Sequence, residues 1–109
     1  MSIVWVTNDP GHNFTDAERY GTLRVLTKGV VDIFNPDRLR RTLEEQLAYF
    51  NAAEDLLLLS GAVMTCALSV GVLARDMVSP LKLLVFDAKT RTYVVRHLDM
   101  RKEPQNGKA

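Results

Sequence analysis

The chain has 109 residues, of which 47% are hydrophobic and 25% charged, and its formal net charge is +1. This length and composition are typical of one soluble globular domain, which we expect over residues 1–100, with a disordered tail over residues 101–109. A nucleic-acid binder usually gathers a basic excess on one face, so nucleic acid is not an expected partner. Because the N-terminus carries no secretory-signal pattern and the single cysteine, Cys66, cannot form an internal disulfide, we expect a cytoplasmic location.

The first elements are a strand and a long loop. The apolar, β-branched segment Ile3–Thr7 predicts a buried strand, which the turn-forming residues Asn8–Gly11 end. Within the loop that follows, Thr15 and Glu18 have the spacing of a capping box. This spacing predicts one short helical turn over Asp16–Tyr20.

Two further strands are expected next, Thr22–Leu26 and Val30–Phe34, paired as a hairpin with Asp32 pointing outward. A helix should follow directly, because Asn35 can cap it and proline and aspartate come after the cap. Its apolar residues recur at spacings of four, four and three, which predicts one buried stripe: Leu39, Leu43, Leu47 and Phe50.

The most apolar part of the chain is the uncharged run Leu56–Ala74. The turn-forming pair Ser60–Gly61 divides it into a strand, Leu56–Leu59, and a helix of about Ala62–Met77. Undivided, the run would approach the roughly twenty residues that span a bilayer, but its division disfavours a membrane span. Since the helix has no charge over Ala62–Ala74, it is either sandwiched or docks against a second subunit, which makes a homodimer contact an open alternative.

Two strands close the chain, Leu81–Phe86 and Arg91–His97. The β-α-β-α-β order predicts a largely parallel sheet with right-handed crossovers, to which the terminal pair adds an antiparallel edge. We therefore expect a small Rossmann-like α/β sandwich with a mainly parallel sheet, antiparallel hairpin strands and two main helices.

Ligands of open α/β sheets bind outside the carboxyl ends of the strands, where loops lead into helices. If these ends converge on one rim, the polar residues that follow them should form one binding site for a small anionic ligand. The residues predicted to bind it are Asn8, His12, Asp16, Arg19, Asn35, Ser60 and Gly61.

Among these residues, His12 is the one whose side chain could take part in catalysis. With Asp9 or Asp16 nearby it could act as a general base or bind a phosphate, although a role in local backbone hydrogen bonding is favoured. Asp16 in a first helical turn is stabilising without any chemistry, and Ser60 lacks the flanking glycines of a nucleophile elbow. The sequence has no glycine-rich nucleotide cradle and no metal-ligand spacing, so no catalytic residue, metal or cofactor is assigned.

The aromatic residues divide into two groups. Packing in the core or at a sheet edge explains six of them: Trp5, Phe34, Tyr49, Phe50, Phe86 and Tyr93. Phe14 and Tyr20 lie in the polar loop, where they either stack on a base or pin the loop to the sheet.

Four segments carry a resemblance: NDPGHNFTDAERYG, LTKGVVDIFNPDRL, LLLLSG and LLVFDAKTRTYV. The chain is similar in them to small uncharacterised α/β proteins encoded by phages and related mobile elements, and the likeness spans most of residues 3–97. The resemblance implies a mobile-element origin and a place in the host cytoplasm. Interference with host or rival machinery is common among such proteins, which favours binding over turnover.

Three functional hypotheses follow. The leading one is an accessory binding module that recognises a host protein or a small anionic, nucleotide-like ligand at the strand ends. The second is a small phosphoryl-group hydrolase or transferase with His12 and Asp16 as acid and base and Ser60 holding the anion. The third is a structural homodimer without a ligand.

Overall fold

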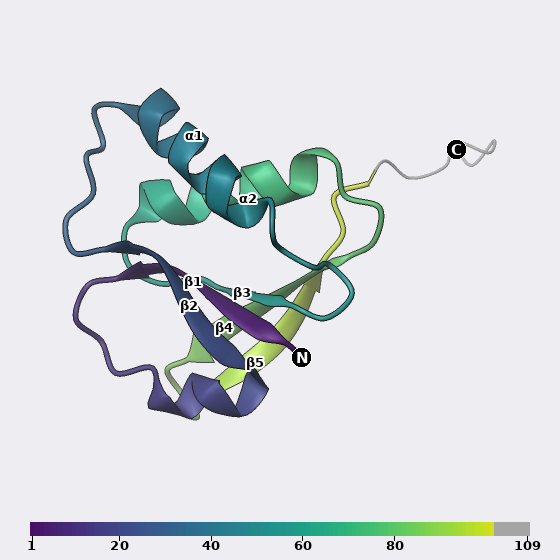
Figure 1. Cartoon of the computed structure of the whole chain (residues 1–109). Coiled ribbons are helices and arrows are strands. Elements are labelled where there is room, and N and C mark those ends of the chain that lie inside the picture. The colour runs from purple at the N-terminus through teal and green to yellow at the C-terminus, as the bar shows by residue number, and fades with distance from the viewer. Residues whose placement is uncertain (102–109) are drawn as a thin grey trace, which may run out of the picture.

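The computed structural model describes residues 1–101, so the tail predicted for residues 101–109 lies, apart from its first residue, outside the described residues. One five-stranded sheet has the order β2-β1-β3-β4-β5, in which β5 alone is antiparallel to its neighbour (Figure 1). The strands are β1 (Ile3–Asp9), β2 (Thr22–Lys28), β3 (Leu56–Leu58), β4 (Leu81–Asp87) and β5 (Thr92–Leu98). The mixed α/β class, the mainly parallel sheet and the antiparallel terminal pair are confirmed.

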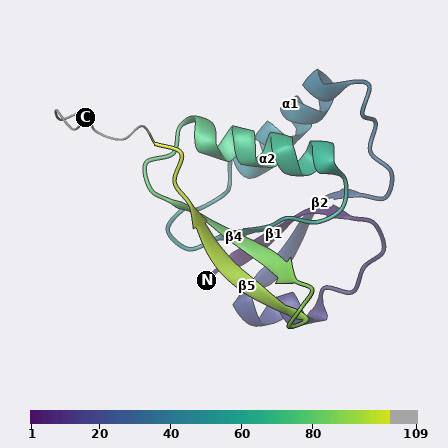
Figure 2. The same cartoon turned by 180° about the vertical axis from the view of Figure 1, so that it is seen from behind.

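Three helical elements cover the sheet unequally. The two main helices, α1 (Pro36–Leu47) and α2 (Val63–Arg75), lie on the same face, whereas the 3-10 helix η1 (Thr15–Tyr20) lies on the other (Figures 1 and 2). The path of the chain explains this arrangement, because the step from β1 to β2 runs toward one edge and the next two steps run toward the other. Right-handed crossovers in opposite directions place their connections on opposite faces.

The side chains of the central strands alternate between two hydrophobic clusters. On β1, Trp5 packs with the helices, whereas Val4 and Val6 pack on the η1 side. On β3, Leu57 faces the helices and Leu58 faces η1, and all three residues of the strand are buried. The prediction that this apolar strand is covered on both faces is confirmed.

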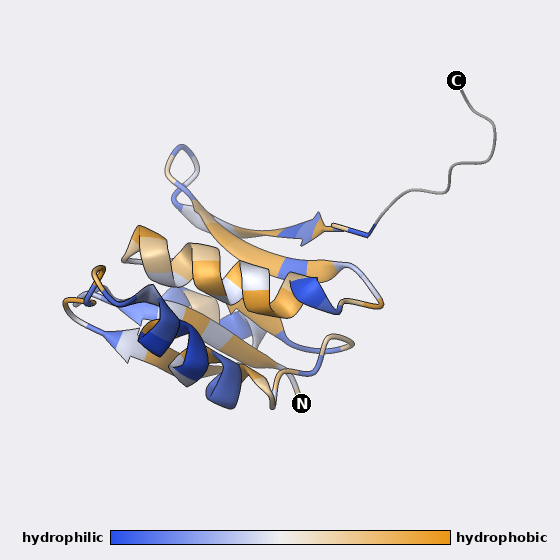
Figure 3. Cartoon of the chain, turned by 90° about the horizontal axis from the view of Figure 1, so that it is seen from above, coloured by the Kyte–Doolittle hydropathy of each residue, from blue (hydrophilic) through white to orange (hydrophobic). Residues whose placement is uncertain are grey.

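The predicted start of α1 is confirmed in detail. Asn35 Oδ1 accepts the backbone N–H of Arg38 at 3.2 Å, and Pro36 occupies the first turn. Leu43 and Leu47 of the apolar stripe are buried against the sheet. Figure 3 shows the contrast with its neighbour, since α1 is mostly hydrophilic and α2 mostly hydrophobic.

The uncharged run is divided as the sequence predicts, into β3 and α2. The helix α2 has 13 residues, and within residues 1–101 no helix is long and apolar enough to cross a bilayer. Its most enclosed side chains are Thr65 and Ser69, whose hydroxyl groups have no hydrogen-bond partner among the described residues.

The predicted hairpin of Thr22–Leu26 with Val30–Phe34 is wrong. The first strand extends to Lys28 as β2 and pairs in parallel with β1, and the second segment leaves the sheet as an irregular loop. A local hydrogen bond explains the loop, because Asp32 Oδ1 accepts the backbone N–H of Phe34 at 2.9 Å and closes an Asx turn. As a result, the side chains of Val30 and Phe34 are exposed. The packing expected for Phe34 is therefore wrong, and so is that expected for Tyr49, which lies just after α1 and is also exposed.

The predicted helical turn exists as η1, but the capping box does not form. Phe14 is the residue before the helix, and no side chain in the described part of the chain caps its first turn. Thr15 Oγ1 instead bonds to Asn13 Oδ1 at 2.5 Å. The helix is held by tertiary contacts, among them Tyr20 Oη, which donates to the carbonyl of Tyr93 on β5 at 3.0 Å.

Candidate functional site

The carboxyl ends of β1, β2, β3 and β4 lie at one edge of the sheet because these four strands are parallel. The chain leaves β1 for η1 on one face and leaves β3 for α2 on the other (Figure 2). The two connections therefore diverge between neighbouring strands, which is the point where open α/β sheets form a ligand crevice.

A pocket of about 430 Å³ lies at this point, and we call it the edge pocket. It opens between the loop after β1, the β3–α2 turn and the β4–β5 hairpin. Its lining combines apolar and aromatic side chains with a few polar groups: His12, Asn13, Phe14, Leu58, Leu59, Ser60, Gly61, Phe86 and Tyr93.

Aromatic rings form much of the wall. The rings of Phe86 and Tyr93 meet edge to face at 5.4 Å between centroids, since these residues are directly paired in the β4–β5 hairpin. His12 and Phe14 form a second edge contact at 6.1 Å. Phe14 is itself buried in the η1-side cluster, so it pins the loop to the sheet and also lines the pocket.

The Ser60–Gly61 turn is anchored by two polar side chains of β1. The Thr7 hydroxyl accepts the backbone N–H of Ser60 at 2.8 Å and donates to the carbonyl of the same residue at 2.7 Å. Asn8 lies against Gly61, donates from Nδ2 to the carbonyl of Gly29 at 3.2 Å, and accepts from the Thr27 hydroxyl at 2.7 Å. These contacts fix the pocket wall from behind.

The start of α2 adjoins this turn and carries unused donors. Cys66 donates the first hydrogen bond of the helix, to the carbonyl of Ala62, so the N–H groups of Val63 and Met64 precede the first intrahelical bond. No side chain of residues 1–101 caps this end. The end of the helix beside Gly61 therefore has a positive potential from its free amides.

Three of the seven residues predicted to bind a ligand line the edge pocket: His12, Ser60 and Gly61. Asn8 is buried behind the pocket and holds its wall. Asp16 lies on η1 outside the lining, but it acts on the pocket electrostatically. The pKa of Tyr93 is raised, first by burial of the phenol and second by the negative charge of Asp16.

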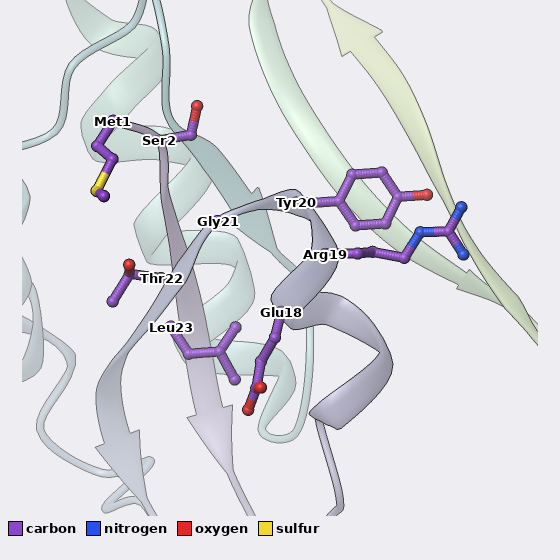
Figure 4. Close-up of a pocket in the computed structure, with 8 residues that line it drawn as sticks. All are labelled: Met1, Ser2, Glu18, Arg19, Tyr20, Gly21, Thr22 and Leu23. Atoms are coloured by element: carbon purple, nitrogen blue, oxygen red, sulfur yellow. The ribbon is translucent and has the colours of Figure 1, made fainter.

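Arg19 and Asn35 lie away from the edge pocket. Arg19 lines an open hollow of about 690 Å³ beside Met1, Ser2 and Gly21, at the edge where β1 and β2 begin (Figure 4). In Figure 4 the side chains around this hollow diverge, and the Arg19 guanidinium lies 5.4 Å from the centroid of the Tyr20 ring. The side chain of Asn35 caps α1.

Sequence reasoning missed part of the lining. Phe86 and Tyr93 are explained by sheet packing, but their pairing across the final hairpin also brings both rings to the carboxyl edge. The turn residues Asp87–Thr90 could have given this register, because a tight hairpin fixes which residues face each other. Leu58 was recognised only as a core residue.

The site does not contain an assembled acid-base pair among residues 1–101. His12 is exposed and makes no hydrogen bond to Asp9 or Asp16, and the Asp9 carboxylate accepts the backbone N–H of Gly11 at 2.8 Å. Within the same residues, no three histidine, cysteine or acidic side chains gather as a metal site would need. The arrangement supplies an aromatic wall, an imidazole and helix amides, which suit binding of a ring and an anion.

The fold and the edge pocket together define a small mixed α/β protein with a pocket at the carboxyl edge of its sheet. The chain belongs to the phage Pam3 gp32-like protein family, whose model matches residues 5–100. This match confirms the resemblance to small phage-encoded proteins. No curated protein and no solved structure matches the chain.

Proposed function

We propose that this phage-family protein is a binding module that takes a small anionic, nucleotide-like ligand in the edge pocket. The observation that carries the proposal is the edge pocket itself, in which a wall of Phe14, Phe86 and Tyr93 faces the polar turn at Ser60–Gly61. Ligand pockets typically combine an apolar lining with a small number of well-placed polar groups.

The size of the pocket limits which ligands can fit. A volume of about 430 Å³ is near the lower end of the range for small-molecule sites. We infer that it takes one ring system with one anionic group rather than a dinucleotide. The ring would rest on the aromatic wall, and the anion would lie toward His12 and the start of α2.

A thermal-shift series with nucleoside monophosphates, followed by isothermal titration calorimetry, tests the proposal. Phe86→Ala and His12→Ala should each weaken binding at least tenfold. The melting temperature of the His12→Ala variant without ligand should change little, because His12 is exposed. Phe34→Ala is the matched control, because Phe34 is 89% exposed and lies in another loop. Unchanged binding in both pocket variants would contradict the proposed site.

The enzymatic alternative uses the same residues as acid and base. The missing hydrogen bond between His12 and Asp16 favours binding over turnover. A phosphate-release assay on nucleoside monophosphates and phosphomonoesters should therefore give no activity above buffer. Turnover that disappears in a folded His12→Ala variant would establish the hydrolase instead.

A protein partner is the second candidate, and exposed apolar side chains favour it. Val63 begins α2 two residues after the pocket-lining Gly61, Val30 follows β2, and they are 82% and 101% exposed. Exposed apolar side chains that gather in a patch are typical of protein contacts. If the nucleotide panel gives no shift, Val63→Asp should abolish capture of a host protein, whereas Val78→Asp, at an equally exposed valine elsewhere, should leave the capture intact.

The homodimer through Ala62–Ala74 stays a prediction. Val63, Ala67 and Gly71 form the exposed side of α2. Multi-angle light scattering across a concentration series tests it, and a strict monomer at every concentration would remove it.

A further inference from the structure

The sheet ends in two edge strands, β2 and β5, and side chains cover the backbone of β5 (Figure 1). The carbonyl of Tyr93 accepts the Tyr20 hydroxyl at 3.0 Å, and the carbonyl of Val95 accepts Arg96 Nη1 at 2.9 Å. Proteins commonly protect a free strand edge with such groups, because unpaired backbone at an edge pairs readily with another chain. The β5 edge is therefore protected against the addition of a strand.

The backbone of β2 is directed differently. Thr22 donates its N–H to the carbonyl of Ser2 at 3.1 Å, so its backbone groups face β1. Successive residues of a strand alternate in direction, which turns the N–H and C=O groups of Leu23 and Val25 toward the outer side of the sheet. These two residues supply the backbone groups to which an added strand would bind.

The space beside the start of β2 is open. Thr22 and Leu23 line the hollow of about 690 Å³ at the amino ends of β1 and β2 (Figure 4). Within residues 1–101 a single side chain bonds to the backbone of β2, namely Gln46, whose Nε2 donates to the Leu26 carbonyl at 3.4 Å. Of the two sheet edges, β2 is thus the one that can accept a further strand.

The two faces of β2 differ in chemistry. Leu23 and Val25 are half-buried against the hydrophobic cluster on the η1 side. Arg24 is on the face of the helices, where its guanidinium lies 5.0 Å from the centroid of the Trp5 ring. Since side chains alternate along a strand, Lys28 is on the same face as Arg24.

The positive charges of this edge are not neutralised by ion pairs. β2 contains no acidic residue, and neither Arg24 nor Lys28 forms an ion pair among the described residues. Asp9 is opposite Lys28 in the register with β1, but its carboxylate accepts the backbone N–H of Gly11 at 2.8 Å. Both cations are therefore available to carboxylates of a partner.

We propose that β2 is the docking edge for an extended, acidic segment of a partner protein, which adds to the sheet as a further strand. Main-chain hydrogen bonds to Leu23 and Val25 hold the segment, and its alternate side chains give specificity. Carboxylates lie beside Arg24 and Lys28 on one face, and apolar side chains extend the η1-side cluster on the other. The segment thus alternates acidic and apolar residues.

A second copy of the chain suits this edge less well. Two β2 strands paired antiparallel around Val25 would bring Arg24 of one copy diagonally across from Lys28 of the other, on one face and without an acid on either strand. Like charges within reach across two strands oppose their pairing. Because other elements line the edge pocket, this inference stands apart from the nucleotide-binding proposal.

Selection from a library of random seven-residue peptides, the length of β2, on the immobilised full-length protein tests the inference. The enriched peptides should alternate acidic and apolar residues. One of them, made synthetically, should bind in a calorimetric titration, and the amide groups of Leu23 and Val25 should gain protection from hydrogen exchange in the complex. Enriched peptides without acids, no enrichment, or protection confined to other strands would overturn the inference.

Two variants separate the backbone and charge contributions. Val25→Pro should abolish peptide binding, because proline lacks the N–H that faces the added strand. Lys28→Glu should weaken binding by about three- to tenfold through the loss of attraction and the new repulsion. Lys89→Glu, at an exposed lysine in the β4–β5 turn, is the matched control and should keep the affinity.

The remaining outcomes are equally decisive. If Val25→Pro does not fold, the lysine pair decides, and equal affinities of Lys28→Glu and Lys89→Glu would refute the acidic segment. Protection of Leu23 and Val25 without peptide, together with a dimer in light scattering, would assign the edge to a second copy and overturn the proposal.

Discussion

Gly61 is in direct contact with the side chain of Asn8. A Cβ atom at position 61 would lie 2.7 Å from Asn8 Cβ and 2.9 Å from Asn8 Cγ, and the backbone of Gly61 has a φ of 75°. The turn between β3 and α2 therefore depends on a residue without a side chain in front of a buried asparagine. The same contact fixes the position of Gly61, which lines the edge pocket.

Gly61→Ala should destabilise the protein strongly. The left-handed backbone alone costs an alanine about 1–2 kcal/mol, and the contact with Asn8 adds to this cost. Gly29→Ala is the matched control, because Gly29 has a φ of 67° but open space around its Cβ position. Urea unfolding should show a larger loss of the free energy of unfolding for Gly61→Ala, and equal losses would contradict the packing argument.

Thr7→Val should loosen the Ser60–Gly61 turn without changing the volume of the core. Valine has the shape of threonine but leaves the N–H and carbonyl of Ser60 without their partner, at a cost of about 1–3 kcal/mol. Thr42→Val, on the exposed side of α1, should cost less because its hydroxyl bonds only weakly to the Arg38 carbonyl, at 3.2 Å. Chemical denaturation compares the two variants, and an equal loss would refute the role of Thr7.

Asp55→Asn should destabilise the start of the sheet. The carboxylate is 2% exposed and accepts from Ile3 N at 3.0 Å, Trp5 Nε1 at 3.0 Å and Asn51 N at 2.9 Å. The amide of asparagine would turn an NH₂ group toward one of these donors, so we expect a loss of about 1–3 kcal/mol. Fluorescence of the single tryptophan reports unfolding, and Asp76→Asn, at an exposed acid, is the control.

The ion pair between the two main helices should be visible in a pH titration. The pKa of Glu44 lies below its usual value, chiefly because Arg75 Nη2 hydrogen-bonds to its carboxylate at 2.8 Å. Since the folded pKa is lowered, the pair stabilises the protein above the unfolded pKa of Glu44, and this contribution is lost as the pH falls through the folded value.

Arg75→Ala should therefore raise the pKa of Glu44 more than Arg40→Ala does, because the hydrogen bond from Arg75 is the largest cause of the shift. The carboxyl ¹³C chemical shift of Glu44 measures this pKa. A larger rise in Arg40→Ala would show that the contact within α1 matters more than the contact between helices.

The hairpin error shows what local sequence cannot decide. Val30–Phe34 has the composition of a strand, but a strand also needs a neighbour at the right register. In the fold, β2 pairs in parallel with β1 at one edge of the sheet, and the chain then leaves the sheet for α1 instead of folding back along the outer edge of β2. Asp32 stabilises that exit by closing a turn with Phe34.

The candidate site was predictable in position but only partly in composition. Parallel strand order placed the loops after β1 and β3 at one edge, which brought His12 and Ser60 to the edge pocket. Asn8 follows the same rule along the chain, yet its side chain points into the protein and is 1% exposed. Contacts with Thr27 and Gly61 decide the direction of the Asn8 side chain, and both residues are far from Asn8 in the sequence.

The sequence by itself determined the apolar strands, the start of α1 at Asn35 and the division of the uncharged run at Ser60–Gly61. Periodicity, capping and turn chemistry are local, so they can be read along the chain. Only the tertiary structure decided that Phe86 and Tyr93 line a pocket, that Arg19 lies at the opposite edge and that Asp16 acts on Tyr93. These relations depend on strand register and on the packing of η1 against both β2 and β5, which join residues distant in the sequence.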